Sequence, residues 1–137
     1  MQILTASPHL TLYLHQGASR ALEAQWLGFA SSAVLRKSTL EAVVLARQHR
    51  ITSWIADDRL LGPVRPVDLD WIAQQVLPQL IAVGIKRFAR IEAIDPLNKL
   101  LIGQAQAAAE QQLPFELRTF LDPQAARTWA CSELLGS

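Results

Sequence analysis

The sequence is poor in the features that mark secreted, membrane-spanning and nucleic-acid-binding proteins. Its single cysteine, Cys131, has no partner for an internal disulfide, and no stretch combines a basic start, an apolar middle and a small-residue cleavage site. No apolar run approaches the roughly 20 residues that are needed to cross a bilayer. Thirteen Lys and Arg against twelve Asp and Glu leave a net charge of +1, too little to attract nucleic acid or anionic lipid. We therefore predict a cytoplasmic protein with no nucleic-acid partner and no membrane insertion.

Sequence motifs of common active sites and cofactor sites are also missing. There is no glycine-rich phosphate loop, no His-Glu-x-x-His, no cysteine pair and no Gly-x-Ser-x-Gly turn. His9 and His15 have no metal ligand at suitable spacing, so we interpret both as surface residues. A Mg²⁺ pocket around Asp57 and Asp58 lacks the Ser or Thr followed by Lys expected at later strand ends. We predict a non-enzymatic protein without metal or cofactor, with Asp57 or Asp58 acting as a catalytic base as the alternative.

The composition that is present favours one folded domain. Half of the 137 residues are hydrophobic and only 18% are charged, which is far from the composition of disordered chains. A chain of this length can bury a core without disulfides or metals. We predict a single domain over residues 1–137.

The first half of the chain predicts a hairpin, a helix and a central strand. Leucines alternate with polar residues over Leu10–His15, and a turn at Gln16–Ser19 leads to a second alternating stretch over Leu22–Trp26. Gln2–Thr5 is a candidate edge strand. A helical pattern then fills the chain up to the apolar run Ile51–Arg59, which we interpret as a buried central strand ending in a loop.

The second half predicts two further strand–helix units. A strand over Arg87–Glu92 precedes Asp95-Pro96, and a strand over Phe115–Phe120 precedes Asp122-Pro123. In both dipeptides Asp can cap a helix and Pro can occupy its first position. We predict an α/β fold with a mixed sheet of about five strands, an N-terminal antiparallel hairpin plus three parallel strands, and helices mainly on one face.

Candidate site residues gather after the central strand. Ligand sites in α/β folds lie beyond the carboxyl ends of strands, and there the chain places Asp57, Asp58 and Arg59. A loop containing Arg65 follows, and Asp68 is predicted to cap the next helix. In the alternative interpretation, Asp57 only hydrogen-bonds the turn and Arg59 pairs with it.

The last two strands also carry a charge pattern. If the repeated Asp-Pro sets the strand register, Arg90 meets Glu116 and Glu92 meets Arg118 on one face of the sheet. Unpaired buried ions cost several kcal/mol each, so we predict that this face is at least partly open. It is then either a solvated set of ion pairs or a docking face for a partner or a second copy.

Several short motifs resemble a known family. They are Trp26-Leu27-Gly28, the run from Trp54 to Arg59, Asp68 with Trp71-Ile72, and Gly84-Ile85-Lys86-Arg87-Phe88-Ala89. The sequence resembles small bacterial proteins described as STAS/SEC14 domain-containing, whose role is unassigned. The resemblance implies the successive βα turns shared by anti-sigma-factor antagonists and lipid-binding SEC14 domains. The phosphorylatable Ser of the antagonists is missing here, because the stretch from Asp57 to Gly62 contains no Ser or Thr.

Two functions follow as expectations. The first is a non-enzymatic interaction or regulatory module with a STAS-like fold, expected to be a homodimer, whose partner surface includes the five residues Asp57, Asp58, Arg59, Arg65 and Asp68. The alternative is a carrier of a small apolar ligand or lipid, with a pocket near Trp54 and Trp71.

Overall fold

Alternating apolar residues form the antiparallel half of the sheet. In the computed structural model, which describes residues 1–134, β1 (Gln2–Ala6), β2 (Leu10–Gln16) and β3 (Arg20–Gly28) pair in sequence as antiparallel neighbours. Leucines at every second position of β2 face the core, as expected for a strand with one buried face. The predicted hairpin is confirmed, and β1 is present as its edge strand.

Three parallel strands complete the sheet. They are β4 (Ser53–Leu61), β5 (Arg87–Ile91) and β6 (Glu116–Phe120), and the strand order is β1-β2-β3-β4-β5-β6. Each parallel connection contains a helix, as the βα crossover requires. The predicted α/β fold class is confirmed, with six strands where the sequence predicted about five.

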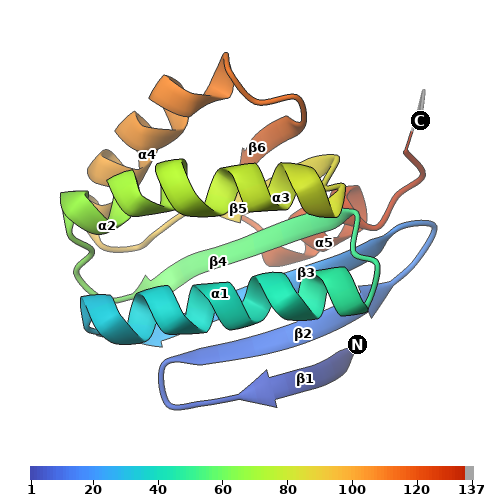
Figure 1. Cartoon of the computed structure of the whole chain (residues 1–137), viewed down its shortest axis with the longest axis horizontal. Coiled ribbons are helices and arrows are strands. Elements are labelled where there is room, and N and C mark those ends of the chain that lie inside the picture. Colours follow the sequence, from blue (N-terminus) through green and yellow to red (C-terminus); the bar gives the residue numbers. More distant parts are fainter. Residues whose placement is uncertain (135–137) are drawn as a thin grey trace.

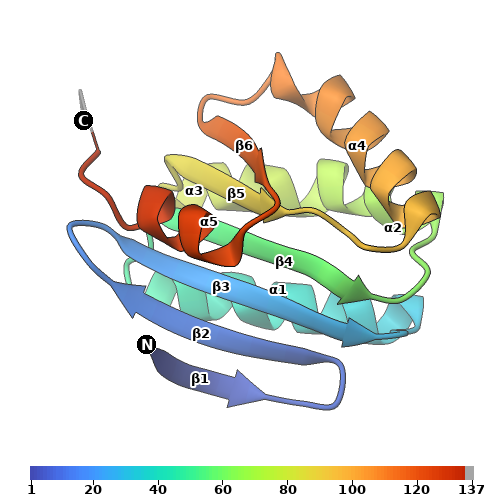
Figure 2. The ribbon, with the colours of Figure 1, turned by 180° about the vertical axis from the view of Figure 1, so that it is seen from behind.

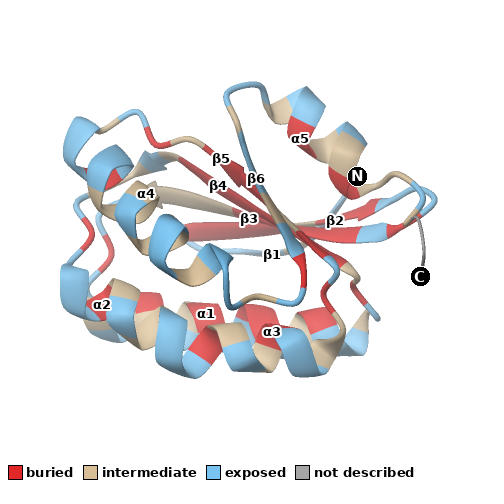
Figure 3. Cartoon of the chain, turned by 90° about the horizontal axis from the view of Figure 1, so that it is seen from above, coloured by how far each residue is buried: buried red, intermediate tan, exposed pale blue. Residues whose placement is uncertain are grey.

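The helices divide unequally between the two faces of the sheet. Figure 1 shows α1 and the α2–α3 segment in front of the sheet, and Figure 2, seen from behind, shows α5 on the opposite face. Figure 3 shows that α4 lies on the same side as α1, α2 and α3, and we call these helices the main layer. The predicted one-sided arrangement is therefore confirmed for all helices except the last. Their bounds are α1 Ser32–Gln48, α2 Pro66–Trp71, the π-helical turn η1 Ile72–Val76, α3 Leu77–Val83, α4 Pro96–Glu110 and α5 Pro123–Ala130.

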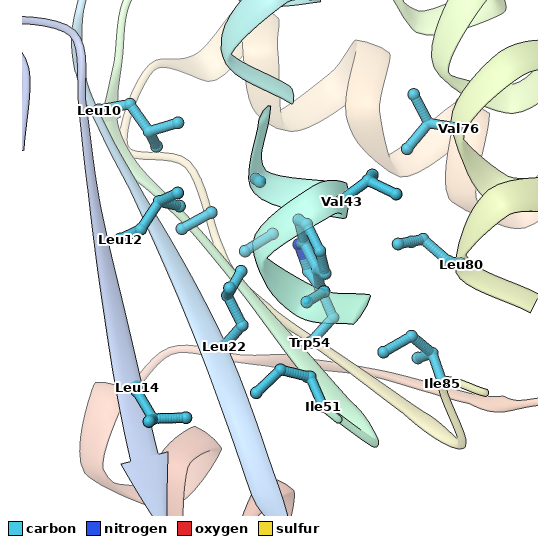
Figure 4. Packing of buried hydrophobic residues seen from close by; sticks show 14 of the residues in the cluster. Leu10, Leu12, Leu14, Leu22, Val43, Ile51, Trp54, Val76, Leu80 and Ile85 are labelled. Carbon is cyan, nitrogen blue, oxygen red and sulfur yellow. The ribbon is translucent and has the colours of Figure 1, made fainter. Parts of the chain in front are cut away.

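The main core lies between the sheet and α1, η1 and α3. Figure 4 shows Trp54 of β4 among Leu22, Val43 and Leu80, all of them buried. A second cluster lies on the other face of the sheet, where Ala126 and Ala130 of α5 pack against small and branched strand residues. Because alanine adds little bulk, α5 can approach the sheet closely. Strand β4 is therefore covered on both sides.

The two Asp-Pro dipeptides start helices as predicted. The Asp95 side chain accepts a hydrogen bond from the backbone N–H of Asn98, and Asp122 accepts from two backbone N–H groups of α5. Pro follows each Asp at the first helical position, where its missing donor has no consequence. Local capping chemistry thus determines where α4 and α5 begin.

The segment after β4 differs from its prediction. Asp57, Asp58 and Arg59 belong to the strand, because β4 continues to Leu61 through pairing with β3. The connection is correspondingly short, and α2 begins at Pro66. Asp68 does not cap this helix; it lies buried in the first turn, and no side chain caps α2.

Helices α2 and α3 form one helical segment with a π-helical turn between them. The turn directly precedes the helix that contains Pro78, whose ring removes one backbone donor. The segment ends at Gly84, which has a φ of +103°. Glycine adopts this left-handed conformation without the steric penalty that a Cβ atom brings.

The predicted charge ladder between β5 and β6 is wrong. Thr119, and not Glu116, lies opposite Arg90, while Arg118 lies opposite Ala89. The segment that joins β6 to α5 is shorter than the segment that joins β5 to α4. The two Asp-Pro dipeptides therefore lie at different distances from their strands, and aligning them does not give the register of β5 with β6. An odd shift in register exchanges the two faces of a strand.

The corrected register separates the four charges. Arg90 faces the main helix layer, whereas Glu116 and Arg118 pair with each other at 3.7 Å on exposed β6. Ala89 and Ile91 lie on the opposite face of β5 from Arg90 and pack with the α5 cluster. The face that carries Arg90, predicted to be at least partly open, is covered by the helices that line the cavity with it, and α5 covers the other face over β3, β4 and β5 (Figure 2).

Asn98 ties α4 to the end of β4. Its amide nitrogen donates to the backbone oxygens of Leu61 and Gly62 at 3.0 and 2.8 Å, and its amide oxygen accepts from the backbone N–H of Val64 at 3.0 Å. The side chain is 1% exposed. Gly62 is required here, because a Cβ atom would lie 2.7 Å from the backbone of Phe29.

Replacing Asn98 with Ala should lower the free energy of unfolding by about 2–4 kcal/mol, because three backbone groups lose their partners. Urea denaturation measures the change. The matched control is Gln104→Ala, an exposed amide on the same helix, which should change stability little. Equal effects of the two substitutions would contradict the role assigned to Asn98.

Candidate functional site

An apolar cavity lies between the sheet and the helices of the main layer. Its volume is about 170 Å³. Strands β2 to β6 form its floor, and α1, the α2–α3 segment and α4 form its walls. Its larger apolar lining residues are Leu10, Trp26, Leu35, Trp54, Leu61, Val64, Leu69, Ile72, Val76, Leu77, Leu80, Phe88, Ile102 and Leu117.

The two tryptophans predicted to form a pocket are placed differently. Trp54 points from β4 into the main layer and lines the cavity. Trp71, at the end of α2, is not a lining residue; the Arg36 guanidinium lies 5.3 Å from its ring centroid, a cation–π contact. The structure therefore brings one of the two predicted ligand residues to the cavity.

Asp58 is the acidic group of the cavity. Side chains alternate along a strand, so Asp58 faces the same side as Trp54 and Ala56 and lines the cavity with them. It is 6% exposed, and its carboxylate makes no hydrogen bond or ion pair with any residue of the described chain. Burial raises the pKa of Asp58 to about 7, and the positive charge of Arg90 opposes that rise only in part.

Arg90 is the basic group of the cavity. Its Nη2 atom donates to Thr119 Oγ1 at 3.2 Å and lies 3.3 Å from Glu92 Oε1. Its Nε and Nη1 atoms have no hydrogen-bond partner within residues 1–134. The sequence pattern predicted Arg90 on a partly open face. Residues two positions apart on a strand share a side, so its position two residues after the apolar Phe88 was the signal that both face the helices.

A separate polar network lies on the α5 face. Glu23 of β3 is fully buried, and both its oxygens accept from Arg127 of α5, at 2.7 and 2.9 Å. His15, predicted to be a surface residue, is instead buried 2.9 Å from Glu23. Burial by itself raises the pKa of Glu23, but hydrogen bonds from His15 and Arg127 outweigh it and lower the pKa to about 2.

Asp57 belongs to this second face. It accepts from Arg59 Nε at 2.9 Å and Arg59 Nη2 at 2.7 Å, which is a bidentate ion pair within β4. The arrangement matches the structural interpretation of these two residues, in which Arg59 pairs with Asp57. Asp57 is only 1% exposed, so it is not part of an accessible surface.

The other two predicted partner residues lie near the start of α2. Asp68 is buried and accepts from Ser32 Oγ at 2.6 Å and Arg36 Nε at 3.1 Å, and so joins α2 to α1. Arg65 precedes α2 and is exposed. The five predicted partner residues therefore do not form one surface.

Two further features are absent from residues 1–134. No group of three or more His, Cys, Asp or Glu side chains there could hold a metal ion. None of the described helices is both long and apolar enough to cross a membrane.

Comparison with known proteins supports the fold. No protein-family model and no curated protein matches the sequence. A similar solved structure is that of an uncharacterised DUF3478-family protein from Shewanella loihica PV-4, described as having a SpoIIAA-like fold. The match has a TM-score of 0.58 and 18% identity, and covers 93% of this chain and 99% of that chain.

This chain has a STAS-like fold. The SpoIIAA-like neighbour confirms that part of the predicted resemblance. At 18% identity the comparison shows the fold alone, and the relation to SEC14 domains stays a prediction.

The Glu23 network makes stability depend on pH. A carboxyl whose pKa falls from 4.5 to about 2 on folding contributes about 3 kcal/mol of stability. Because the folded pKa is the lower one, this contribution is present above about pH 4.5 and is lost as the pH falls towards 2. Denaturation of the Glu23→Gln variant should therefore show a shallower loss of stability over this range than the wild type.

The control for this prediction is Glu116→Gln, a glutamate exposed on β6. Its pH profile should follow that of the wild type. The Glu23→Gln protein will be less stable at neutral pH, since Arg127 loses a charged partner, so the slopes and not the absolute values are compared. Parallel slopes for wild type and Glu23→Gln would contradict the prediction.

Proposed function

We propose that the protein binds a small, largely apolar ligand in the cavity of the main layer and does not transform it chemically. The observation that carries the proposal is the cavity itself, a mostly apolar space with two charged side chains, Asp58 and Arg90, in its wall. Ligand sites commonly combine an apolar lining with a few polar groups that orient the ligand. Asp58 and Arg90 would serve that purpose.

The volume limits the ligand. A cavity of about 150 Å³ in another protein accommodates benzene, and the cavity here is about 170 Å³. Typical drug-sized pockets are larger, at about 300–1,000 Å³. The ligand is therefore a molecule with one ring or one short chain, and a whole phospholipid would not fit.

Filling the cavity tests the proposal. The Ala105→Leu substitution on α4 adds three carbon atoms to a lining position, so it should weaken binding of 1-octanol, an uncharged probe, by about tenfold or more. Isothermal titration calorimetry measures the affinity. Filling an existing cavity should leave stability equal or higher, which separates lost binding from unfolding.

The matched control is Ala107→Leu, the same change at an exposed position of the same helix that does not line the cavity. Its affinity for 1-octanol should equal that of the wild type. Failure of the wild-type protein to bind 1-octanol and other eight-carbon probes would refute the proposed function.

A second candidate function is the predicted interaction module. Large apolar side chains are exposed where β3 and β4 end and α2 begins: Phe29 is 55% exposed, and Leu60 and Val67 are each 57% exposed. Arg65 is exposed beside Val67. Large exposed apolar residues favour a contact with another protein, and a second copy of the chain is the simplest partner.

Replacing Leu60 and Val67 with Ser should convert a dimer into a monomer, because the contact would lose its apolar area. Sedimentation velocity measures the oligomeric state. The control replaces Val44 and Ile81, exposed apolar residues of α1 and α3, with Ser and should leave the dimer intact. A wild-type protein that is monomeric at every concentration would contradict the homodimer.

A further inference from the structure

We propose that the cavity selects a small monocarboxylic acid, whose carboxylate lies between Arg90 and Asp58 and whose apolar body fills the rest of the space. The inference rests on the proposed function and adds the chemical class of the ligand. It also adds a consequence, namely that the acid binds together with one proton held at Asp58.

The unpartnered donors of Arg90 are the first observation. Its side chain is 8% exposed, yet two of its three nitrogen atoms have no partner in the described chain. Buried polar groups without partners are rare in folded proteins and call for an explanation. Because Arg90 lines the cavity, a carboxylate there can accept the hydrogen bonds that the protein does not supply.

The position of Asp58 is the second observation. Both Asp58 and Arg90 line the cavity, but they make no hydrogen bond or ion pair with each other, and a buried charge without a partner is costly. A ligand group that contacts both side chains would compensate them together. A carboxylate meets this requirement when Asp58 is protonated, since it accepts from the carboxyl O–H and from the guanidinium.

The neighbouring charges define how binding depends on pH. Asp58 and Arg90 are the charged residues of the lining within the described chain. Asp57 of β4 and Glu92, the residue after β5, both raise the pKa of Asp58. Of the facing helices, α1 and α4 contribute the uncharged Thr39 and Gln106, and the α2–α3 segment contributes apolar residues.

Two carboxyl groups in one small site share a single proton, because like charges so close cannot both ionise at low cost. The apo pKa of Asp58, about 7, means that the empty protein already holds this proton near neutrality. Binding of the acid should therefore be strongest below pH 7 and should weaken as the pH rises.

The experiment compares three eight-carbon probes with different ends: octanoate, 1-octanol and octylamine. Calorimetric titrations at about pH 6 and about pH 8.5 should show octanoate bound more tightly than the other two at the lower pH, and about tenfold more weakly at the higher pH. The affinity of 1-octanol should change by less than about twofold, since it carries no charge.

Variants separate the roles of the two side chains. Arg90→Met should reduce octanoate affinity by about tenfold or more and leave 1-octanol bound. The Asp58→Asn variant should bind octanoate as tightly at about pH 8.5 as at about pH 6. At about pH 8.5 it should therefore bind octanoate more tightly than the wild type does, and misfolding cannot produce such a gain. The controls are Arg118→Met on the opposite face of β6 and Asp70→Asn on the exposed side of α2, neither of which should alter the titrations.

The outcomes distinguish this inference from the function on which it rests. Absence of binding by all three probes overturns both. Equal binding of octanoate and 1-octanol, or an octanoate affinity that does not change with pH, overturns the acid selectivity and leaves the apolar cavity as a binding site. Tighter binding of octylamine would assign the polar recognition to ionised Asp58 and likewise overturn the inference.

Discussion

The burial of β4 on both faces is the constraint on which the rest of the structure depends. Because side chains alternate along a strand, the consecutive carboxyls of Asp57 and Asp58 face opposite layers. Asp57 is compensated within its own strand by Arg59. Asp58 has no such ion pair on its side of the sheet; the positive charge of Arg90 on β5 lowers its pKa, but the two side chains form no ion pair. Strand β4 thus carries one carboxyl with an ion-pair partner and one without.

The parts of the fold that could be predicted depend on local chemistry. The alternating leucines of β2, the Asp-Pro starts of α4 and α5 and the apolar run of β4 each determine their structure within a few residues. Trp54 belongs to that run and lines the cavity. The STAS-like architecture followed from the order of these elements and from the family resemblance.

The parts that could not be predicted depend on contacts distant in sequence. The partners Glu23 and Arg127 are separated by 104 residues, and Glu23 alone looks like an ordinary polar position of an alternating strand. The Asp-Asp-Arg sequence indicated a loop, whereas pairing of β4 with β3 keeps these residues in the sheet. Likewise, the β6 residue that lies opposite Arg90 depends on the β5–β6 register, which the Asp-Pro spacing did not predict because the two connecting segments differ in length.

The two faces of the sheet differ in how fully their buried charges are paired, and this difference bears on the role of Asp58 and Arg90 in the cavity. On the α5 face, Glu23 is deeply buried, and His15 and Arg127 satisfy both of its oxygens, so this fold can bury a charge and compensate it fully. Burying charge without full compensation lowers stability relative to an apolar core. Arg90 nevertheless has two nitrogen atoms without a hydrogen-bond partner in the described chain, beside a space large enough for a small molecule. Because the same sheet compensates Glu23 on its other side, we infer that the charges of Asp58 and Arg90 are there for a ligand that completes their pairing.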